Sequence, residues 1–362
     1  MKKNIKAEII ADSVNSQGNR ITTFVLTYPR FIHAELLTHR LFSRNAASSR
    51  AIPASKMIKD IEEDPFIPVA WQKAHSGMQG TEYMEGDDIE DITDTWMYGL
   101  NNALATARMM KSQDCTKQLV NRILEPYQWY TCIATATEYD NFFELRCPQY
   151  DIGDGVLHKS RKDAIQSQKD LGIDTEIAEM FAISELDWLK ANKGAGEIHI
   201  SLLAEAMWDS LNESEPKQLK AGKWHIPFGD NLKNSAKWVN FLIKHTKNRQ
   251  LHTYPDGTGE VDMLAIKIAT ARCARISYLN FEGEDDYEAD IKLYDRLLKE
   301  GHMSPFEHCA RAMSEDEYSS YIQGISYEDH GGMFSSKKTL DEKAYGWSGN
   351  FRGFVQLRKE IE

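Results

Sequence analysis

The chain has 362 residues, enough to bury a substantial core in one large domain or two. Charged residues make up 27% of it and hydrophobic residues 41%, which excludes a largely disordered chain. The formal net charge of −12 disfavours a general binder of nucleic acid or of membrane surfaces, because such a protein needs broad positive potential. A small anionic substrate held by a few arginines is compatible with this charge.

The cysteines and the chain start bear on the compartment. Five cysteines are scattered without any Cys-x-x-Cys pair: Cys115, Cys132, Cys147, Cys273 and Cys309. This pattern disfavours a disulfide framework and a cysteine zinc site, so we expect no metal and a reducing cytoplasm. The start, MKKNIKAEII, has no apolar run of signal-peptide length, and no later run reaches a membrane span. We therefore expect a soluble, cytoplasmic protein.

The first 150 residues predict strands alternating with helices. Residues 21–28 (ITTFVLTY) are nearly continuous in apolar and threonine residues, as in a buried strand. Pro29 suits a first helical turn, and the apolar spacing in FIHAELLTHRLF predicts a helix over residues 31–42. Three further elements are expected: a helical stretch over 93–124, a strand over 128–137 and a short helix over 138–146.

The remaining sequence predicts an insertion and a second helical unit. Residues 151–195 begin with a glycine-rich turn and contain an amphipathic helix near 177–189, which we interpret as an insertion or lid. After it we expect a helix over 202–211, loops over 216–256, a helical unit from Met263, an amphipathic helix ending at Gly301 and a final helix over 349–358. Residues 1–150 would then form one module and 196–362 a second, both packing into one catalytic domain.

Polar and basic side chains are densest between Thr38 and Arg50 (THRLFSRNAASSR). The preceding helix would deliver His39 and Arg40, and the next ten residues add three serines, one asparagine and two arginines. Arginine forks, serine hydroxyls and exposed backbone N–H groups are the groups that bind a phosphate. A solvated basic loop at a helix end is the plain alternative, and composition alone does not separate the two.

Two other motifs are ambiguous when each is taken alone. GHMSPFEH (residues 301–308) follows an amphipathic helix and could be a turn with a surface histidine. The stretch from Asn121 to Arg146 contains NRILEP, then YT, then NFFELR. Its aromatic residues could be ordinary core, and Arg146 a cation at a helix C-terminus.

Together the three motifs resemble those of the flavin-dependent thymidylate synthases of the ThyX type. His-Arg-x-x-Ser-x-Asn-x-x-Ser-x-Arg is similar to a family signature that begins Arg-His-Arg, and GHMSPFEH to a second hallmark. The third motif is similar to the family's Arg-x-x-Leu-Pro, Tyr-Thr and Asn-Phe-x-x-Leu-Arg run, and IATARCARISYL resembles the opening of a usual member. The chain departs from the family at Thr38, which replaces the first arginine, at Ala46, where many members have glutamate, and at Glu125.

The resemblance implies both a fold and a reaction. The fold is α+β, with a central mixed or antiparallel sheet flanked by helices, plus the helical insertion. The reaction is the reductive methylation of dUMP to dTMP, in which methylenetetrahydrofolate supplies the carbon, FAD carries hydride and NADPH reduces FAD. The implied partners are these small molecules, without nucleic acid or membrane, and further copies of the chain in a homotetramer with flavin sites between subunits.

The resemblance also implies roles for individual residues. One set binds the nucleotide: Ser48, Ser49, Arg50, Arg122 and Arg146. A second set binds the cofactor: His39, Arg40, Asn45, Asn141 and His308. A third set is catalytic: Arg146, Ser48 and His308. Arg146 would lie against the uracil and stabilise negative charge on the ring, while His308 would lie at the edge between flavin and folate. No side-chain nucleophile is required.

Three alternative functions remain at this point. An enzyme on the same scaffold could quench the exocyclic methylene with water and give hydroxymethyl-dUMP. A non-catalytic flavin- or nucleotide-binding paralogue is suggested by Thr38 and Ala46. A thymidylate synthase with a cysteine nucleophile would need a Pro-Cys-His setting, whereas Cys147 precedes its proline.

The order of the motifs is unusual, because usual members run from SPFEH to the arginine signature and then to the third motif. Circular permutation would explain the order, since chain ends tolerate relocation, and duplication with loss of opposite halves is the competing history. Permutation predicts that His308 lies close to residues 39–50. It also predicts that the helix over 349–358 packs near the helix over 29–42, and that both termini lie near the original junction.

Overall fold

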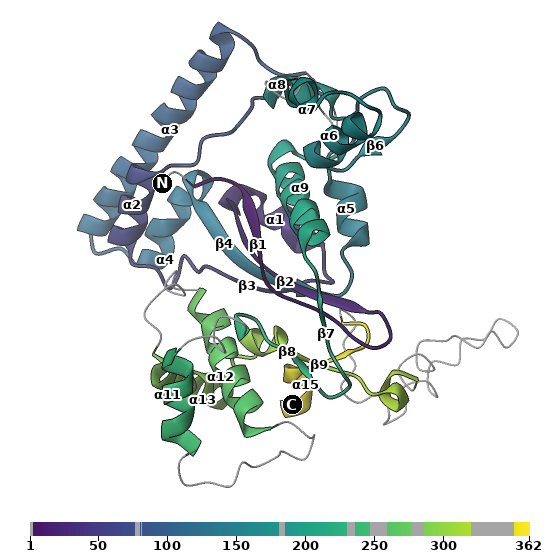
Figure 1. Ribbon diagram of the computed structural model, residues 1–362. Helices are drawn as coiled ribbons and strands as arrows, with labels where there is room; N and C mark the ends of the chain where they lie inside the picture. The colour runs from purple at the N-terminus through teal and green to yellow at the C-terminus, as the bar shows by residue number, and fades with distance from the viewer. Residues whose placement is uncertain are drawn as a thin grey trace, which may run out of the picture.

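The strand β2 (Arg20–Pro29) lies at the centre of the fold. The computed structural model describes residues 3–76, 80, 82–180, 185–229, 236–246, 259–276, 286–319 and 351–362. A five-stranded sheet runs in the order β3-β4-β2-β1-β7 (Figure 1). Its other strands are β1 (Lys6–Val14), β3 (Ser43–Ala46), β4 (Trp129–Ala136) and β7 (Lys217–Gln218). Only the β1–β7 pairing is parallel, so the expected α+β class with a mixed sheet is confirmed.

Both faces of β2 are buried, which explains its nearly continuous apolar sequence. Phe24, Leu26 and Tyr28 pack into the large core on one face. Val25 packs on the other face, against Ile133 of β4 and Cys273. The alternation follows from the period of two along a strand. The strands predicted over 21–28 and 128–137 are therefore confirmed.

Helices cover the first face of the sheet (Figure 1). They are α1 (His33–Thr38), α2 (Ala54–Glu63), α3 (Asp87–Ser112), α4 (Lys117–Val120), the 3₁₀ helix η2 (Asn121–Tyr127), α5 (Asp140–Arg146) and α9 (Ile198–Glu213). The expected helices over 138–146 and 202–211 are confirmed. The helical stretch expected over 93–124 is confirmed, but it is divided: Asp114 takes a left-handed φ of 59° after α3, and the Thr116 side chain accepts from Gln118 N to start α4.

The second face carries α11 (Ala236–Thr246), α12 (Glu260–Arg275) and α13 (Tyr287–Glu300). α13 ends at Gly301, whose φ of 72° allows the left-handed cap, as expected. The loops expected over 216–256 are wrong in part. α11 packs Trp238 and Phe241 against Ala265 and Ile268 of α12, and the region also holds β7 and β8.

A small three-stranded sheet joins the chain end to the SPFEH segment. It has the order β10-β9-β8, with β8 at Trp224–His225, β9 at Ala310–Ala312 and β10 at Phe354–Gln356. The 3₁₀ helix η4 (Ser304–Glu307) precedes β9, and α15 (Leu357–Ile361) follows β10. The final helix expected over 349–358 is therefore wrong. Phe354 and Val355 instead pair with Ala312 and Arg311 of β9, while residues 349–350 lie outside the described residues.

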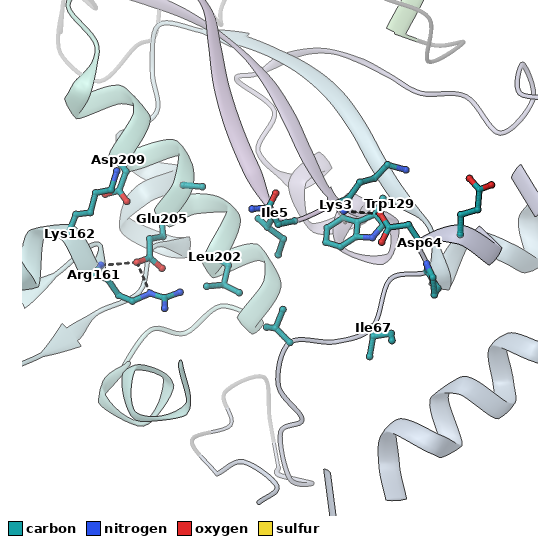
Figure 2. A pocket seen from close by; sticks show the side chains of 15 residues that line it. Lys3, Ile5, Asp64, Ile67, Trp129, Arg161, Lys162, Leu202, Glu205 and Asp209 are labelled. Carbon is teal, nitrogen blue, oxygen red and sulfur yellow. Dashed lines mark hydrogen bonds and ion pairs between the residues drawn. The ribbon is translucent and has the colours of Figure 1, made fainter. Parts of the chain in front are cut away.

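The insertion contains short elements that attach to α9. They are β5 (Tyr150–Asp151), β6 (Leu157–His158), α6 (Arg161–Asp170), α7 (Thr175–Met180) and α8 (Glu185–Ala191). Arg161 N donates to Glu205 of α9 at 2.7 Å (Figure 2), and Trp208 of α9 donates to Asp163 at 2.7 Å. The helix expected near 177–189 falls on α7 and α8, with 181–184 outside the described residues. The lid and the three domain boundaries stay predictions.

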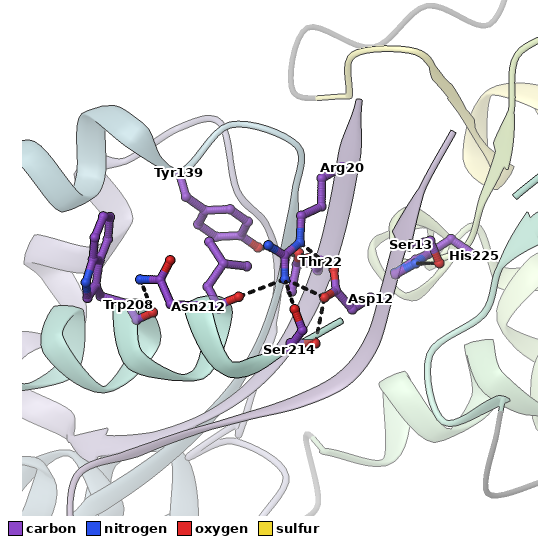
Figure 3. Close-up of polar contacts among 10 residues, drawn as sticks. Asp12, Ser13, Arg20, Thr22, Tyr139, Trp208, Asn212, Ser214 and His225 are labelled. Carbon is purple, nitrogen blue, oxygen red and sulfur yellow. Dashed lines mark hydrogen bonds and ion pairs between the residues drawn. The ribbon is translucent and has the colours of Figure 1, made fainter. Parts of the chain in front are cut away.

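The strand β1 was not expected from the sequence, and it places the N-terminus away from the start of β2. Arg20 of β2 donates to both oxygens of Asp12 on β1, at 2.9 and 2.6 Å, and to the Leu211 carbonyl at the end of α9 (Figure 3). Because β1 runs antiparallel to β2, Lys3 lies at the opposite end of the sheet, where its N–H donates to Asp64. The prediction that both termini meet is therefore wrong for the N-terminus. Among the described residues, no helix is long and apolar enough to span a membrane.

Candidate active site

The signature segment begins where α1 ends, at Thr38, which is earlier than the sequence predicts. The Thr38 hydroxyl donates to the Glu35 carbonyl at 2.7 Å. Arg44 Nη1 donates to the carbonyls of Leu36 and His39, both at 3.1 Å. These bonds satisfy carbonyl groups that a helix end leaves without partners. The helix therefore does not deliver Arg40, and the next residues enter β3.

The helix α5 brings its last residue, Arg146, against His39. Arg146 Nε donates to His39 Nε2 at 3.1 Å, and the His39 ring packs edge-on against Phe142. A guanidinium only donates, so Nε2 must be the unprotonated nitrogen and the neutral ring carries its proton on Nδ1. Burial, followed by the charges of Arg146 and Arg44, lowers the pKa of His39 to about 4. His39 is therefore a neutral donor at Nδ1 near pH 7.

Glu35 completes this cluster, and the sequence analysis missed it. Its Oε2 lies 3.5 Å from Arg146 Nη1. Burial raises the pKa of the Glu35 carboxyl, as does the nearby Glu197, while Arg146 and His199 act in the opposite direction. Glu35 precedes His39 by four residues, so helical spacing could have placed both side chains on one face.

The second half of the signature forms a tight turn held by its carbonyl groups. Ala51 N and Ile52 N donate to the Ser48 carbonyl at 2.9 and 3.1 Å. The Asn121 side chain donates to the Ser49 and Ile52 carbonyls at 2.8 and 3.0 Å. Ser48 and Ser49 are half-buried, and Ser48 Oγ accepts from Arg50 N at 3.3 Å. The turn thus holds the Ser48 hydroxyl and the backbone of Ser49 next to Arg50.

Three cationic residues belong to this turn or adjoin residues that bond to it. Arg50 is exposed, and its side chain has no hydrogen bond or ion pair with any other residue that the structure describes. Lys117 Nζ donates to the Ala51 carbonyl at 3.0 Å. Arg122 adjoins Asn121, which bonds to Ser49, and its half-exposed side chain pairs with Glu125 at 3.2 Å. Arg122 is thus next in sequence to a residue that bonds to the turn, while its own side chain pairs with Glu125, which neutralises part of its charge.

The two clusters lie at opposite ends of β3. His39 and Arg146 lie before the strand, and the turn at Ser48 follows it. Ala47 N donates to the Thr131 carbonyl of β4 at 2.9 Å, which continues the pairing of β3 beyond Ala46. Four strand residues span about 13 Å, a length that a nucleotide or the ring system of a flavin can bridge.

Asn45 ties the signature to the second module. Its side-chain nitrogen donates to the Cys273 carbonyl of α12 at 2.6 Å. Its side-chain oxygen accepts from Ser304 Oγ, in the SPFEH segment, at 3.3 Å. Gln356 Nε2 donates to Ser43 Oγ at 3.0 Å and to the Glu307 carbonyl at 3.1 Å. The predicted meeting of SPFEH with the signature is therefore confirmed within one chain.

His308 lies in the interior, at the end of a hydrogen-bonded string of side chains. His308 Nδ1 bonds to Thr135 Oγ1 at 2.9 Å, and Thr135 bonds to Thr23 Oγ1 at 2.8 Å. Thr23 bonds to His225 Nε2 at 2.8 Å, and His225 Nδ1 to Ser13 Oγ at 3.0 Å (Figure 3). Both imidazoles are completely buried, and burial lowers each pKa to about 3. The string connects three strands of the large sheet to β8 and the SPFEH segment.

The position of His308 differs from the open flavin edge that the resemblance implies. The residue has no exposed surface, and its Nε2 has no hydrogen-bond partner within the described part of the chain. His308 therefore makes no contact with the surface near His39 in this arrangement. The sequence could not show this, because nothing in SPFEH identifies the threonines of β2 and β4 as its partners.

Arg40 and Asn141 remain open to solvent. Arg40 follows His39 in the turn after α1, and Asn141 lies in the first turn of α5. Neither side chain has a partner among the residues for which positions are described. Both are available to a ligand or to another copy of the chain.

The cavity with a volume of about 800 Å³ lies elsewhere, between the residues before β1, the segment after α2, α6 and α9 (Figure 2). Trp129, Arg161, Leu202 and Glu205 are among its lining residues. None of the residues assigned from the motifs lines it. Because Arg161 and Glu205 already bond to each other, we place the candidate site at β3 rather than in this cavity.

No family model matches the sequence, and no curated protein matches it significantly. Two solved structures similar to the chain are of PolB from Streptomyces cacaoi, a UMP/dUMP methylase, bound with 5-Br dUMP and with 5-Br UMP. The first is 11% identical, covers 59% of this chain and 91% of that chain, and gives a TM-score of 0.39. The second is 16% identical, covers 52% of this chain and 97% of that chain, and gives a TM-score of 0.34. The function is therefore argued from the residues of this chain.

Proposed function

We propose that this chain is a flavin-dependent thymidylate synthase of the ThyX type, which converts dUMP to dTMP with methylenetetrahydrofolate, FAD and NADPH. One observation carries the proposal: the three motifs converge on β3 although they lie far apart in the sequence. Ser304 of the second motif bonds to Asn45, while Asn121 and Arg146 of the third bond to Ser49 and His39. Ordinary core or surface roles for three separate motifs would not require this convergence.

The turn after β3 suits the phosphate of the nucleotide. Ser48 and Ser49 supply hydroxyl groups, and Arg50 and Arg122 supply guanidinium groups that can bind phosphate in a fork. Glu125 must then share Arg122 with the phosphate, or release it. The net negative charge of the chain elsewhere does not oppose this local cluster, because charges beyond about 10 Å are largely screened by salt.

The cluster before β3 suits the uracil and the flavin. Arg146 would stabilise negative charge that develops on the pyrimidine, and the Nδ1–H of His39 would donate to an oxygen or nitrogen acceptor. Asn141 and Arg40 are open side chains that fit the polar edge and the phosphates of FAD. When bound, FAD supplies the hydride, and the residues named here bind and orient the reactants.

Two of the expected roles change in this proposal. Asn45 uses its amide to join α12 and the SPFEH segment, so we assign it a supporting role beside the flavin. His308 is a structural residue that holds SPFEH against the sheet. The open positions of Arg40 and Asn141 fit a flavin site that is completed by another subunit, and we propose a homotetramer on this basis.

The packing around β2 supports circular permutation. Ile21, near the start of β2, packs with Ala310 and Ala312 of β9, the strand that follows SPFEH. The junction of the usual chain order would lie there. β1 is then an added strand that precedes the new start.

Flavin binding and product analysis test the proposal. We expect the purified protein to retain flavin absorbance after FAD addition and desalting, and to release tritium from the 5-position of dUMP with folate and NADPH. Mass analysis then separates a methyl product from a hydroxymethyl product. A colourless protein without measurable FAD affinity would contradict the proposal. A yellow protein that neither oxidises NADPH nor releases tritium would indicate the non-catalytic paralogue.

A further inference from the structure

Arg146 is shared between two partners of different charge. Its Nε donates to the neutral His39, at 3.1 Å. Its Nη1 faces the carboxylate of Glu35, at 3.5 Å. The side chains of Arg146 and Glu35 are 23% and 35% exposed, so solvent reaches both groups. The charge that would act on a substrate is thus already balanced inside the chain.

We propose that Glu35 is a positioning residue, which holds Arg146 as its counter-ion in the free protein and yields it to an anionic nucleotide. The inference rests on the proposed function, and it adds a residue to that site which the motifs do not contain. In this proposal Glu35 itself contacts no reactant. It keeps the guanidinium in place beside His39 until the nucleotide arrives.

The geometry favours release over a permanent ion pair. A strong charge-assisted bond between Arg and a carboxylate is about 2.7–2.9 Å long, whereas the nearest pair here is 3.5 Å apart. Glu197 adds like charge next to Glu35, which opposes its ionised form. An anion that engages the guanidinium through two parallel bonds is a better partner than this single long contact. The partly exposed Glu35 can then turn into solvent.

The charged surroundings of Glu35 set the expected pH dependence. The groups facing it are Arg146 on α5, Glu197 before α9 and His199 on α9, while His39 is neutral. Burial already places the pKa of Glu35 above its ordinary value of 4.5, and a bound anion raises it further. Nucleotide binding is then coupled to proton uptake by Glu35. Binding to the natural protein weakens as the pH rises through this pKa, because Glu35 must lose its partner while ionised.

The variant Glu35→Gln tests the proposal, since it keeps the shape and removes the charge. Dissociation constants for dUMP would be measured by calorimetry between pH 5 and pH 8, on the full-length protein with FAD. We expect the variant to bind about three- to fivefold more tightly at pH 8, a range consistent with a partly exposed ion pair. The difference should shrink as the pH falls through the pKa of Glu35, because the protonated carboxyl no longer carries the charge that the variant lacks. Glu144→Gln is the matched control, because it removes a carboxylate of α5 that pairs with Lys159. It should leave the dissociation constant for dUMP unchanged at both ends of the pH range.

A second measurement needs no nucleotide. Free energies of unfolding for Glu35→Gln, Arg146→Gln and the double variant form a cycle that reports the coupling of the two side chains. Coupling above the error at pH 8 that weakens as the pH is lowered supports the counter-ion role. Absence of coupling overturns the inference, whatever the dUMP affinities of the variants. The coupling could be present while Glu35→Gln binds dUMP as tightly as, or more weakly than, the natural protein at pH 8. In that case the proposal that Glu35 yields Arg146 to the nucleotide is wrong. If the coupling is present and the natural protein binds no dUMP, the proposed function fails and Glu35 is only a structural partner.

Discussion

At the scale of single residues, the site is built on charge that the protein itself partly balances. Arg146 faces Glu35 and Arg122 faces Glu125, whereas the exposed Arg50 has no such partner among the described residues. Removing Arg50 therefore deletes a free ligand group, while removing Arg146 also leaves Glu35 and His39 without their shared donor. The two substitutions should differ in their effect on folding and agree in their effect on the nucleotide.

We predict that Arg50→Ala and Arg146→Ala each weaken dUMP binding or the transition state by about 2–4 kcal/mol, because each removes a charge-assisted contact to an anion. Calorimetry and steady-state rates measure this loss, and flavin absorbance should persist in both variants. Arg296→Ala on α13 is the control, since it removes an exposed arginine elsewhere in the structure. Unchanged affinity and turnover in either site variant would remove that residue from the site.

Cysteine substitutions give the complementary prediction. Cys132, Cys147, Cys273 and Cys309 are buried, and burial raises the pKa of each thiol, so none is a ready nucleophile. Single Cys→Ser variants should lose some stability but keep the chemistry, measured as tritium release per folded protein. One Cys→Ser variant that folds yet has no activity would restore the mechanism with a cysteine nucleophile.

At the scale of elements, α1 shows what the sequence could and could not predict. Its start follows from Pro29 and the apolar spacing after it, but its end depends on Arg44, which reaches back to the Leu36 and His39 carbonyls. Such a cap cannot be inferred from periodicity, which continues through Leu41 and Phe42. The strand β1 was missed for a related reason: its outer face is partly solvated, so its alternation is weak. α11 was missed because lysines on its open face mask the apolar residues that pack on α12.

The motifs predicted the neighbourhood of the site better than its contacts. The convergence of Asn45 with Ser304 follows from the resemblance, whereas the burial of His308 does not. Contacts between Glu35 and Arg146, or between His308 and Thr135, join residues more than a hundred positions apart. One sequence without its packing carries no signal for such pairs.

The cap on α1 leads to a stability prediction. Arg44→Met keeps much of the buried stem but removes both bonds to the helix end, so we expect a loss of about 1–2 kcal/mol in the free energy of unfolding. Urea denaturation measures it. Arg40 lies four residues earlier, and its side chain has no partner among the described residues. Arg40→Met should therefore change the free energy of unfolding by less than about 0.5 kcal/mol. Equal effects of the two substitutions would contradict the capping role.

At the scale of the whole molecule, a hydrogen-bonded string with two buried histidines joins β1, β2 and β4 of the large sheet to β8 and the SPFEH segment. His225 and His308 are neutral in the folded chain, with pKa values lowered to about 3 by burial. In the unfolded chain both regain an ordinary value of about 6.5. The unfolded state therefore binds more protons between these two values, and stability falls as the pH drops from about 6.5 towards 3. Well above pH 6.5 this contribution is complete.

We expect each of these histidines to cost the folded state about 1.6 kcal/mol between pH 6.5 and pH 5.0. Urea denaturation at the two pH values measures the change. His308→Gln, which does not titrate, should lower stability at pH 6.5 but show a smaller decrease on acidification than the natural chain. His302→Gln, at an exposed histidine nearby, is the control. An equal decrease in the natural chain and in His308→Gln would show that His308 is accessible to protons.

The string from Ser13 to His308 also has a direction. Every hydroxyl in it donates once, and each neutral imidazole carries one proton, so the five groups can be ordered in only two senses. If the sense runs towards His308, its Nε2 must carry a proton that no atom of the described residues accepts. In the reverse sense that atom is a bare lone pair, which proteins tolerate more readily than a stranded N–H. His308 should therefore donate to Thr135, Thr135 to Thr23, Thr23 to His225, and His225 to Ser13. The missing partner of His308 Nε2 thus sets the direction of every hydrogen bond in the string.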